Sequence, residues 1–433
     1  MQTIIISGNC QAKGLRNALA NAIFDQPTTV KWLKAFEEEH LPGDAVSSED
    51  YRNCRLLLLQ EGSWHNEWVS FDQLPASCPV VRFPNLALNA LWPLAFRDPR
   101  NAQNKLKGFT PYPFGAADSL AHSLLLKGIA EDEIVRQYMA TDLNDLVDLD
   151  RFAEMHDEKF TSIDAKCDIK LWDYVKGNFR TKHLFRTNNH PSGVLMAYTL
   201  HRILAASPLG EWIQNSGTVL ESTAASFGIG AFEDPIHPQV IDHFSLNYLG
   251  KDYKYKYRFE GAFDFESRLR RYLRFDYNEH ALSLTSAVHA GNIEKIREHA
   301  LDAIVRQPDS WYVYYCLATV FQNLGRREDE LRSLLIAKRF ANGQWAVHQR
   351  LAQHYRKYGM RAQALEEQET ALRLEPYRGV VHFQYGLILA DANERERAGA
   401  AFARAYELEP NNPKIAARRP APLPASGVRQ EDL

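Results

Sequence analysis

The sequence lacks the features of a secreted, disulfide-stabilised or membrane-spanning protein. Its five cysteines are an odd number, and no two of them have C-x-x-C spacing. We therefore expect neither a disulfide framework nor a zinc-ribbon site. No stretch approaches the ~18 consecutive apolar residues of a membrane span, and the first residues lack the basic and long apolar segments of a secretory signal. These absences predict a metal-free protein of the reducing cytoplasm.

An excess of charge of one sign is also missing. The 433 residues include 51 Lys and Arg against 54 Asp and Glu, which gives a formal net charge of −3. A dedicated nucleic-acid-binding protein would show a basic surplus, so we predict no nucleic-acid partner. Any phosphate or glycan site must then be a local patch. The length itself is enough for two or three domains.

The C-terminal third contains a repeat of 34 residues. Small residues recur at this spacing, as shown by Ala303, Ala337, Ala371, Ala405 and by Gly291, Gly325, Gly359. Small side chains allow two helices to approach closely, and glycine permits the turn between them. The pattern resembles the tetratricopeptide repeat. This resemblance implies an all-α solenoid over residues 277–412, with three clear repeats and one divergent repeat.

Such arrays usually bind a protein partner, and a structural spacer or a dimerisation element is the alternative reading. The divergent first repeat has Leu284 where a small residue is expected. Residues 413–433 are rich in Pro, Ala and Arg with few large apolar side chains, so we predict a disordered tail.

The N-terminal two-thirds has the pattern of an α/β fold. Four segments have the apolar composition of buried strands: Thr3–Ser7, Arg55–Gln60, Val80–Phe83 and His183–Thr187. Gln11–Ala22 follows the first of them with apolar residues at helical spacing. A long and mostly helical stretch separates the third strand from the fourth. Strands that alternate with helices predict a mostly parallel sheet.

The first strand meets its helix at Gly8–Gln11, which reads GNCQ. Ligand sites of α/β sheets form at such strand-to-helix turns. A cysteine at this turn lies beside unpaired N–H groups and the positive end of the helix dipole, which lower the pKa of a thiol. Asn9 and Gln11 add amide donors for an oxyanion. Cys10 is therefore either a nucleophile or a small packing residue at a tight turn.

A second polar turn, TNNHP at residues 187–191, follows the fourth predicted strand. Because the carboxyl ends of parallel strands share one edge, we expect His190 to face Cys10 across it. His190 would then act as the base of a thiol nucleophile, with Asn188 or Asn189 orienting the imidazole. The alternative is a turn histidine bonded to the local backbone.

The GNCQ and NHPS segments together make the sequence similar to a known family. GNCQ at 8–11, NHPS at 189–192 and the D-P-x-x-P stretch at Asp234–Pro238 resemble the WcbI-type polysaccharide-biosynthesis acetyltransferase family. The resemblance runs over about residues 1–275. It implies a three-layer α/β/α fold related to the SGNH hydrolases. It also implies coenzyme A or acetyl-CoA as ligand, and acetyl transfer to a sugar hydroxyl of a surface or capsular polysaccharide.

The resemblance also implies roles for individual residues. Cys10 takes the nucleophile position and His190 the histidine position, but Thr187 stands where these hydrolases have aspartate. The third member would be an amide, a carboxylate such as Asp118, or absent. The oxyanion would be held by Asn9, Gln11 or Asn85. For the coenzyme A phosphates and the turn beside them we named Gly8, Lys13, Arg180, Lys182 and Arg186.

Two other functions use the same residues. A carbohydrate esterase or deacetylase would give the acyl group to water, and a non-catalytic scaffold would only bind coenzyme A or a glycan. In the first reading the acceptor is a glycan or a nucleotide sugar. Residues 62–68 (GSWHNEW) and 109–114 (FTPYPF) are aromatic segments that would line a pocket or anchor a loop. Residues 251–258 (KDYKYKYR) favour a strand with tyrosines on one face.

Overall fold

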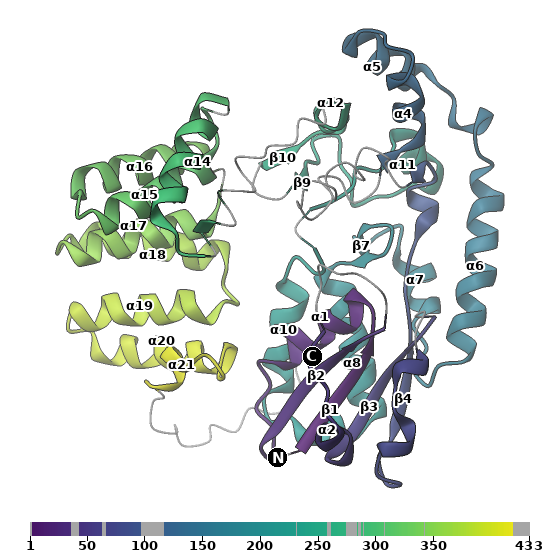
Figure 1. Ribbon diagram of the computed structural model, residues 1–433, viewed down its shortest axis with the longest axis horizontal. Coiled ribbons are helices and arrows are strands. Elements are labelled where there is room, and N and C mark those ends of the chain that lie inside the picture. The colour runs from purple at the N-terminus through teal and green to yellow at the C-terminus, as the bar shows by residue number, and fades with distance from the viewer. Residues whose placement is uncertain are drawn as a thin grey trace. The chain divides into compact units, whose positions relative to one another are not determined.

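The computed structural model describes residues 2–35, 43–62, 66–96, 117–230, 232–257, 261–273, 284, 287–288, 290–306, 308–341 and 343–418. The chain divides into two compact units, Met1–Tyr277 and Asn278–Leu433 (Figure 1). The predicted segment 109–114 and residues 63–65 of the first aromatic segment lie outside the described residues. In the described part of the chain, no helix has the length and apolar character needed to cross a membrane.

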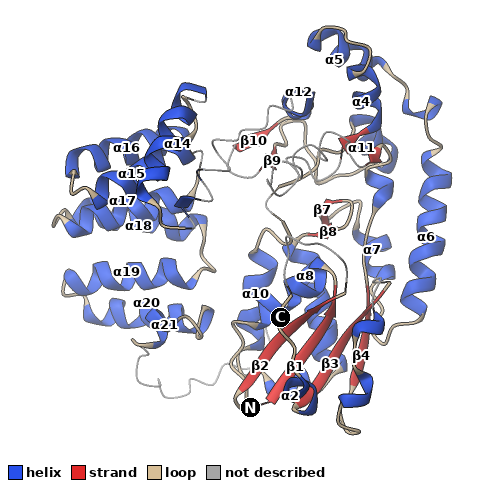
Figure 2. Ribbon diagram, in the orientation of Figure 1, coloured by secondary structure: helices blue, strands red, loops and turns tan. Residues whose placement is uncertain are grey.

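The first unit is built on a four-stranded parallel sheet with the strand order β2-β1-β3-β4 (Figure 2). Its strands are β1 (Gln2–Gly8), β2 (Thr28–Lys34), β3 (Cys54–Glu61) and β4 (Val80–Pro84). Ile4, Ile5 and Ile6 are all fully buried, as is most of the leucine run of β3. Continuous apolar runs are typical of parallel strands that are covered on both faces.

Both faces of the sheet are covered. Ile4 and Ile6 pack with Leu15 of α1 (Cys10–Leu19) and with Leu195 of α8 (Gly193–Ala206), and α10 (Ser216–Ala225) lies beside them. Ile5 points to the opposite face, where it packs with Tyr51 of α2 (Ser48–Arg52). The alternation follows the period of two along a strand. The result is the predicted three-layer α/β/α arrangement.

One predicted strand of this sheet is wrong. Phe185–Thr187 forms β7, but β7 pairs antiparallel with β8 (His190–Pro191) in a separate hairpin. The sheet takes β2 in its place, which the sequence reading missed. Only Trp32 of the seven β2 residues is buried, so this edge strand lacks the apolar run that identified the others.

Other helices extend the first unit beyond the sheet. They are α4 (Ser119–Leu125), α5 (Glu131–Ala140), α6 (Leu149–Ala165), α7 (Trp172–Asn178), α9 (Leu209–Trp212), α11 (Pro238–Phe244) and α12 (Phe265–Leu273). A second core forms where α4, α5 and α12 meet, around Leu124, Tyr138 and Leu269. Two short pairs, β5 (Ala95–Phe96) with β6 (Ala117–Asp118) and β9 (Tyr255–Tyr257) with β10 (Gly261–Phe263), adjoin it. In β9 both tyrosines are buried and Lys256 is exposed, which confirms that strand prediction.

The second unit is an array of antiparallel helices, as predicted. Its helices are α14 (Ile293–Arg306), α15 (Trp311–Asn323), α16 (Arg327–Phe340), α17 (Trp345–Lys357), α18 (Arg361–Leu374), α19 (Gly379–Asp391), α20 (Arg395–Leu408) and α21 (Pro413–Ala416). The starts of α15, α17 and α19 are 34 residues apart. The four lattice alanines are fully buried, and Gly325 and Gly359 have φ of +68° and +74°.

The predicted disordered tail starts too early. Pro413–Ala416 forms the helix α21, in which the Asn412 side chain accepts a hydrogen bond from the backbone N–H of Lys414 and Ile415 is buried. Composition suggested disorder because it does not register a single well-placed apolar residue and an N-cap. Residues 419–433 lie outside the described residues.

Candidate active site

The turn between β1 and α1 is the centre of the candidate site. Its close packing requires glycine at position 8, because a Cβ there would lie 2.4 Å from Gln60 Oε1 and 2.8 Å from the Ala12 Cβ. Gly8 O accepts a hydrogen bond of 3.0 Å from the indole Nε1 of Trp32. Gly8 therefore serves the fold of the turn, and its predicted role beside a phosphate remains a prediction.

Asn9 caps the helix that follows. Its side-chain oxygen accepts a hydrogen bond of 2.8 Å from the backbone N–H of Gln11, and its Nδ2 donates to Asn85 Oδ1 at 2.9 Å. Its own backbone N–H donates to Gln60 Oε1 at 2.9 Å. Asn9 and Asn85, both predicted for the oxyanion, are thus brought together.

Gln11 connects three separate segments. Its Nε2 donates to the carbonyl oxygens of Leu86 at 2.6 Å and Asn189 at 2.9 Å. Its Oε1 accepts from the backbone N–H of Leu86 and from Gln60 Nε2. The side chain is 4% exposed, so these bonds form in a medium of low dielectric constant, where each is worth more and a lost one is costly. Gln11 is a structural tie, which makes it a poor candidate for an oxyanion donor.

The hydrogen bond from Gln11 to Asn189 places Cys10 and His190 at one site, because each is the neighbour of a bonded residue. Helix α1 lies against β8. A Cβ at Gly14, one turn after Cys10, would lie 2.9 Å from Met196 Cε and 3.3 Å from Ile229. The Cα of Gly230, next to Ile229, lies close to the His190 ring, since a Cβ there would be 3.3 Å from Nδ1. Cys10 is partly exposed and forms no disulfide.

Burial controls the protonation of His190. Desolvation lowers the pKa of His190 to about 4, because the charged imidazolium loses its hydration. The Nδ1 atom is buried, and no described residue hydrogen-bonds to it. His190 is therefore neutral at pH 7 and able to accept a proton. Within the described residues, no carboxylate forms an ion pair with this ring.

The residues predicted to orient His190 act on the backbone of the turn. Asn188 O accepts a hydrogen bond of 2.7 Å from the backbone N–H of Leu88. Asn189 Oδ1 accepts from Thr187 Oγ1 at 3.3 Å. Asp118 is not part of this site, because its carboxylate accepts from Tyr138 Oη at 2.6 Å and from the first turn of α4.

The four predicted cations have different surroundings. Lys13 Nζ lies 5.3 Å from the centroid of the Trp32 ring, on the same helix as Cys10. Arg180 and Lys182 are exposed, and they lie over the rings of Phe179 and Tyr174.

Arg186 is held inside the protein. Its guanidinium forms an ion pair with Glu233, whose side chain is 3% exposed, and donates to Phe227 O at 3.2 Å. We therefore regard Arg186 as a structural cation. Lys13 is the predicted cation nearest to Cys10 in the sequence.

Two parts of the site escaped the sequence reading. Gln60 is fully buried at the end of a leucine strand, and a polar residue in such a run was the available signal. The Gly228–Gly230 turn packs against His190–Gly193, and two glycines around one isoleucine were its signal. Among the described residues there is no group of three or more His, Cys, Asp or Glu side chains arranged to hold a metal ion.

The fold and the site together define a class of protein, namely a parallel α/β unit with a cysteine at its first strand-to-helix turn, followed by a helical-repeat unit. Residues 3–211 match the model of a family described as polysaccharide biosynthesis enzyme WcbI. This part of the chain belongs to the WcbI family, as the sequence resemblance indicated. No curated protein sequence matches the chain.

Several solved structures are similar to parts of the chain. One is WcbI, described as a novel polysaccharide biosynthesis enzyme in its native form without a disulfide bond between coenzyme A and a cysteine. It has 16% identity and a TM-score of 0.43, and the match covers 69% of this chain and 97% of that one. A tetratricopeptide-repeat protein of Thermus thermophilus has 19% identity and a TM-score of 0.30, with 35% of this chain and 85% of that one covered. MamA of Desulfovibrio magneticus has 15% identity and a TM-score of 0.28, with 34% and 85% covered.

Proposed function

We propose that the first unit is an acyltransferase that moves an acetyl group from acetyl-CoA to a sugar hydroxyl during polysaccharide biosynthesis in the cytoplasm. The observation that carries this proposal is the joining of Cys10 and His190 through the Gln11–Asn189 hydrogen bond. Family membership over residues 3–211 supports the polysaccharide context. A glycan or a nucleotide sugar would be the acceptor, and acetyl-CoA would be a substrate.

Cys10 and His190 would divide the chemistry between nucleophile and base. Cys10 gives its proton to His190 and attacks the thioester carbonyl. A bond from the acyl carbon to Cys10 Sγ forms, the bond to the coenzyme A sulfur breaks, and His190 returns the proton to that sulfur. The sugar hydroxyl then gives its proton to His190 and attacks the acyl group. Cys10 leaves as a thiolate and recovers the proton from His190.

The start of α1 suits this chemistry. The positive end of its dipole favours the thiolate of Cys10 and the oxyanion of the tetrahedral intermediate. Asn9 and Asn85 lie beside the turn, where Asn9 Nδ2 already donates to Asn85. Lys13 would contact a phosphate of the donor, because Arg186 is already paired with Glu233.

A thiol-release assay tests the proposal. Purified full-length protein is incubated with acetyl-CoA, with and without a panel of sugars, and free thiol is measured. Sugar-dependent thiol release supports transfer. Release of acetate from an acetylated sugar without coenzyme A would instead identify an esterase, and the absence of both reactions would leave a binding scaffold.

Variants at the two central residues test the mechanism. We expect Cys10→Ala and His190→Ala each to lower the rate by a factor of about 10²–10⁴. Cys54→Ala is the matched control, since Cys54 is buried on the other side of the sheet. A Cys10→Ala variant with full activity would exclude the acyl-cysteine route and favour direct transfer with His190 as the base.

We further propose that the second unit recruits a protein partner from the same biosynthesis. Its helices repeat every 34 residues and expose polar faces, while their small residues are used for packing between helices. Pull-down with the full chain and with a chain ending before residue 278 tests this. A partner retained by the shortened chain would contradict the assignment.

A further inference from the structure

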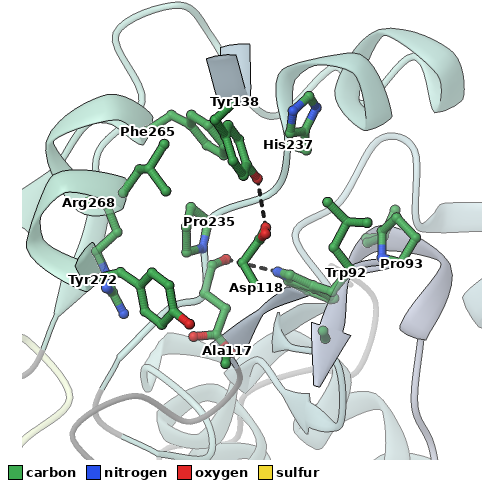
Figure 3. A pocket seen from close by; sticks show the side chains of 15 residues that line it. Trp92, Pro93, Ala117, Asp118, Tyr138, Pro235, His237, Phe265, Arg268 and Tyr272 are labelled. Carbon is green, nitrogen blue, oxygen red and sulfur yellow. Dashed lines mark hydrogen bonds between the residues drawn. The ribbon is translucent and has the colours of Figure 1, made fainter. Parts of the chain in front are cut away.

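A pocket in the first unit, away from the Cys10 turn, has a lining that suits a ligand (Figure 3). It encloses about 610 Å³, open solvent at its mouth included. Small-molecule sites in proteins typically have volumes of this size. One wall is the segment Leu91–Ala95, which follows β4, and the opposite wall is helix α12.

Polar groups are set among the aromatic side chains of this lining. Asp118 and Asp234 contribute carboxyl groups, and Tyr138 and Tyr272 contribute hydroxyls. The indole Nε1 of Trp92 donates to the Asp234 carbonyl oxygen at 3.1 Å, which fixes the ring in the wall. Each Asp118 oxygen accepts one protein hydrogen bond, from Ala121 N and from Tyr138 Oη. A carboxylate has about four lone-pair sites, so Asp118 retains capacity for a donor on a ligand.

His237 supplies an independent sign of a ligand site. Its side chain lines the pocket, and the residue is 6% exposed. Nδ1 accepts a hydrogen bond of 3.2 Å from the backbone N–H of Gln239, and burial lowers the pKa of the ring to about 4. The ring is therefore neutral and carries its proton on Nε2. That buried N–H has no acceptor among the described residues, and an unmet buried donor is costly.

The charges of the lining select against an anionic ligand. Two carboxyl groups face one guanidinium, Arg268, whose Cζ lies 4.1 Å from the ring centroid of Tyr257. Tyr257 is not part of the lining, so the positive charge is directed to another part of the core. A phosphate or carboxylate would meet two groups of its own sign.

We propose that this pocket binds an uncharged sugar ring and is the acceptor subsite of the transfer reaction. Sugar hydroxyls donate to Asp118 and Asp234, a sugar oxygen accepts from His237 Nε2, and the C–H faces pack on Trp92 and Tyr138. An apolar ligand would satisfy none of these polar groups.

The place of the pocket in the chain supports the acceptor role, which rests on the proposed function. The segment after β4 first contacts the candidate active site, where Leu86 bonds to Gln11 and Leu88 N donates to Asn188 O. It then continues as the pocket wall Leu91–Ala95. On the other side, Asp234 N donates to Arg186 O at 2.9 Å, four residues before His190.

The test measures sugar binding without any donor. Calorimetric titration of the full chain uses the methyl glycosides of glucose, galactose and mannose, with glucuronic acid as the charged probe. The key variant is His237→Asn, because asparagine can still cap α11 but lacks the Nε2 donor. His243→Asn, on the same helix, is the control, since His243 bonds to Asp150 outside the pocket. We expect a Kd about tenfold higher for His237→Asn and unchanged for His243→Asn.

The outcomes separate this proposal from the proposed function. Sugar binding that falls in His237→Asn without any acetyl transfer would uphold the pocket and reject the transferase. Transfer with an unchanged acceptor KM in His237→Asn would uphold the transferase and reject the pocket. If His237→Asn does not fold, as judged by circular dichroism, Asp118→Asn takes its place with the same expectation. Tighter binding of glucuronic acid, or no binding of any methyl glycoside, overturns the proposal.

Discussion

At the scale of single residues, the candidate active site depends on positions where no other side chain fits or bonds in the same way. Gly8 is the clearest, because its missing Cβ leaves the space that Gln60 and Ala12 occupy. Gln60 in turn accepts the backbone N–H of Asn9, so the turn and the buried amide are fixed together. The geometry around Cys10 is therefore set by its neighbours.

We predict that Gly8→Ala destabilises the first unit by about 1–3 kcal/mol, because the added methyl forces Gln60 and Ala12 apart. Urea unfolding followed by tryptophan fluorescence measures this. Gly217→Ala in α10 is the control, since a Cβ there has no atom within 4 Å, and alanine favours the helix. Equal stabilities of the two variants would contradict our account of the turn.

A second prediction concerns Gln11, which joins α1 to the segments around Leu86 and Asn189. Gln11→Ala leaves buried carbonyl and N–H groups unpaired, so we expect a loss of about 1–3 kcal/mol in the free energy of unfolding. Activity should fall further than stability explains, because the Asn189–His190 turn loses its tie to Cys10. Asn17→Ala, on the exposed side of the same helix, should change neither quantity.

At the scale of secondary-structure elements, the sequence predicted the buried elements and missed the partly exposed one. The apolar runs of β1, β3 and β4 identified those strands, because burial on both faces leaves little choice of residue. β2 alternates and lies at an edge, so its pattern was too weak. The segment 183–187 was placed in the sheet because local pattern does not distinguish a sheet strand from a hairpin strand, which differ only in their pairing.

The helical repeats allow a prediction at this scale. Glu330 of α16 and His354 of α17 form an ion pair of 3.1 Å with both side chains at most 1% exposed. Replacing His354 with Leu leaves the Glu330 carboxylate buried and unpaired, so we expect a loss of about 3–5 kcal/mol in the second unit.

Two comparisons make this prediction specific. The double variant Glu330→Leu/His354→Leu should recover much of the loss, because a buried pair replaced by apolar residues is often tolerated. Glu407→Ala removes the exposed pair with Arg404 and should cost about 0–1 kcal/mol. A His354→Leu variant as stable as Glu407→Ala would show that the buried pair contributes nothing.

At the scale of the whole molecule, four histidines of the first unit make its stability depend on pH. Burial lowers the pKa of His156, His183, His190 and His237 to about 4 in each case. The unfolded chain binds their protons at about pH 6.5, above the folded pKa values. The stabilising contribution of the neutral rings is therefore present above about pH 6.5 and is lost as the pH falls toward 4.

We expect urea midpoints of the first unit to fall steadily from about pH 7 to about pH 4.5, between the unfolded and folded pKa values. A variant with His156→Phe should show a shallower fall, since one titrating ring is removed. His243→Asn, which leaves all four of these rings in place, should retain the full slope. A pH-independent midpoint over this range would contradict the depressed pKa values.

The sequence predicted both units and the pairing of Cys10 with His190, because each depends on a local or periodic signal. It did not predict the network of Gln11, Gln60 and Asn189, which links residues up to 178 positions apart. It also placed Asp118 as a candidate for the triad, whereas Asp118 lines the separate pocket. Which polar side chains meet across a fold depends on topology, and topology is encoded by the chain as a whole.

The segment that runs from Asn85 to Ala95 contacts the Cys10 turn at one end and forms a pocket wall at the other. A ligand that orders this segment from one end changes the conformational entropy that remains to be lost at the other. Thermodynamic reciprocity then requires that each ligand alter the affinity of the other by the same factor. Order of addition would have no influence on this factor, so donor and acceptor affinities form a closed cycle that two pairs of titrations determine completely.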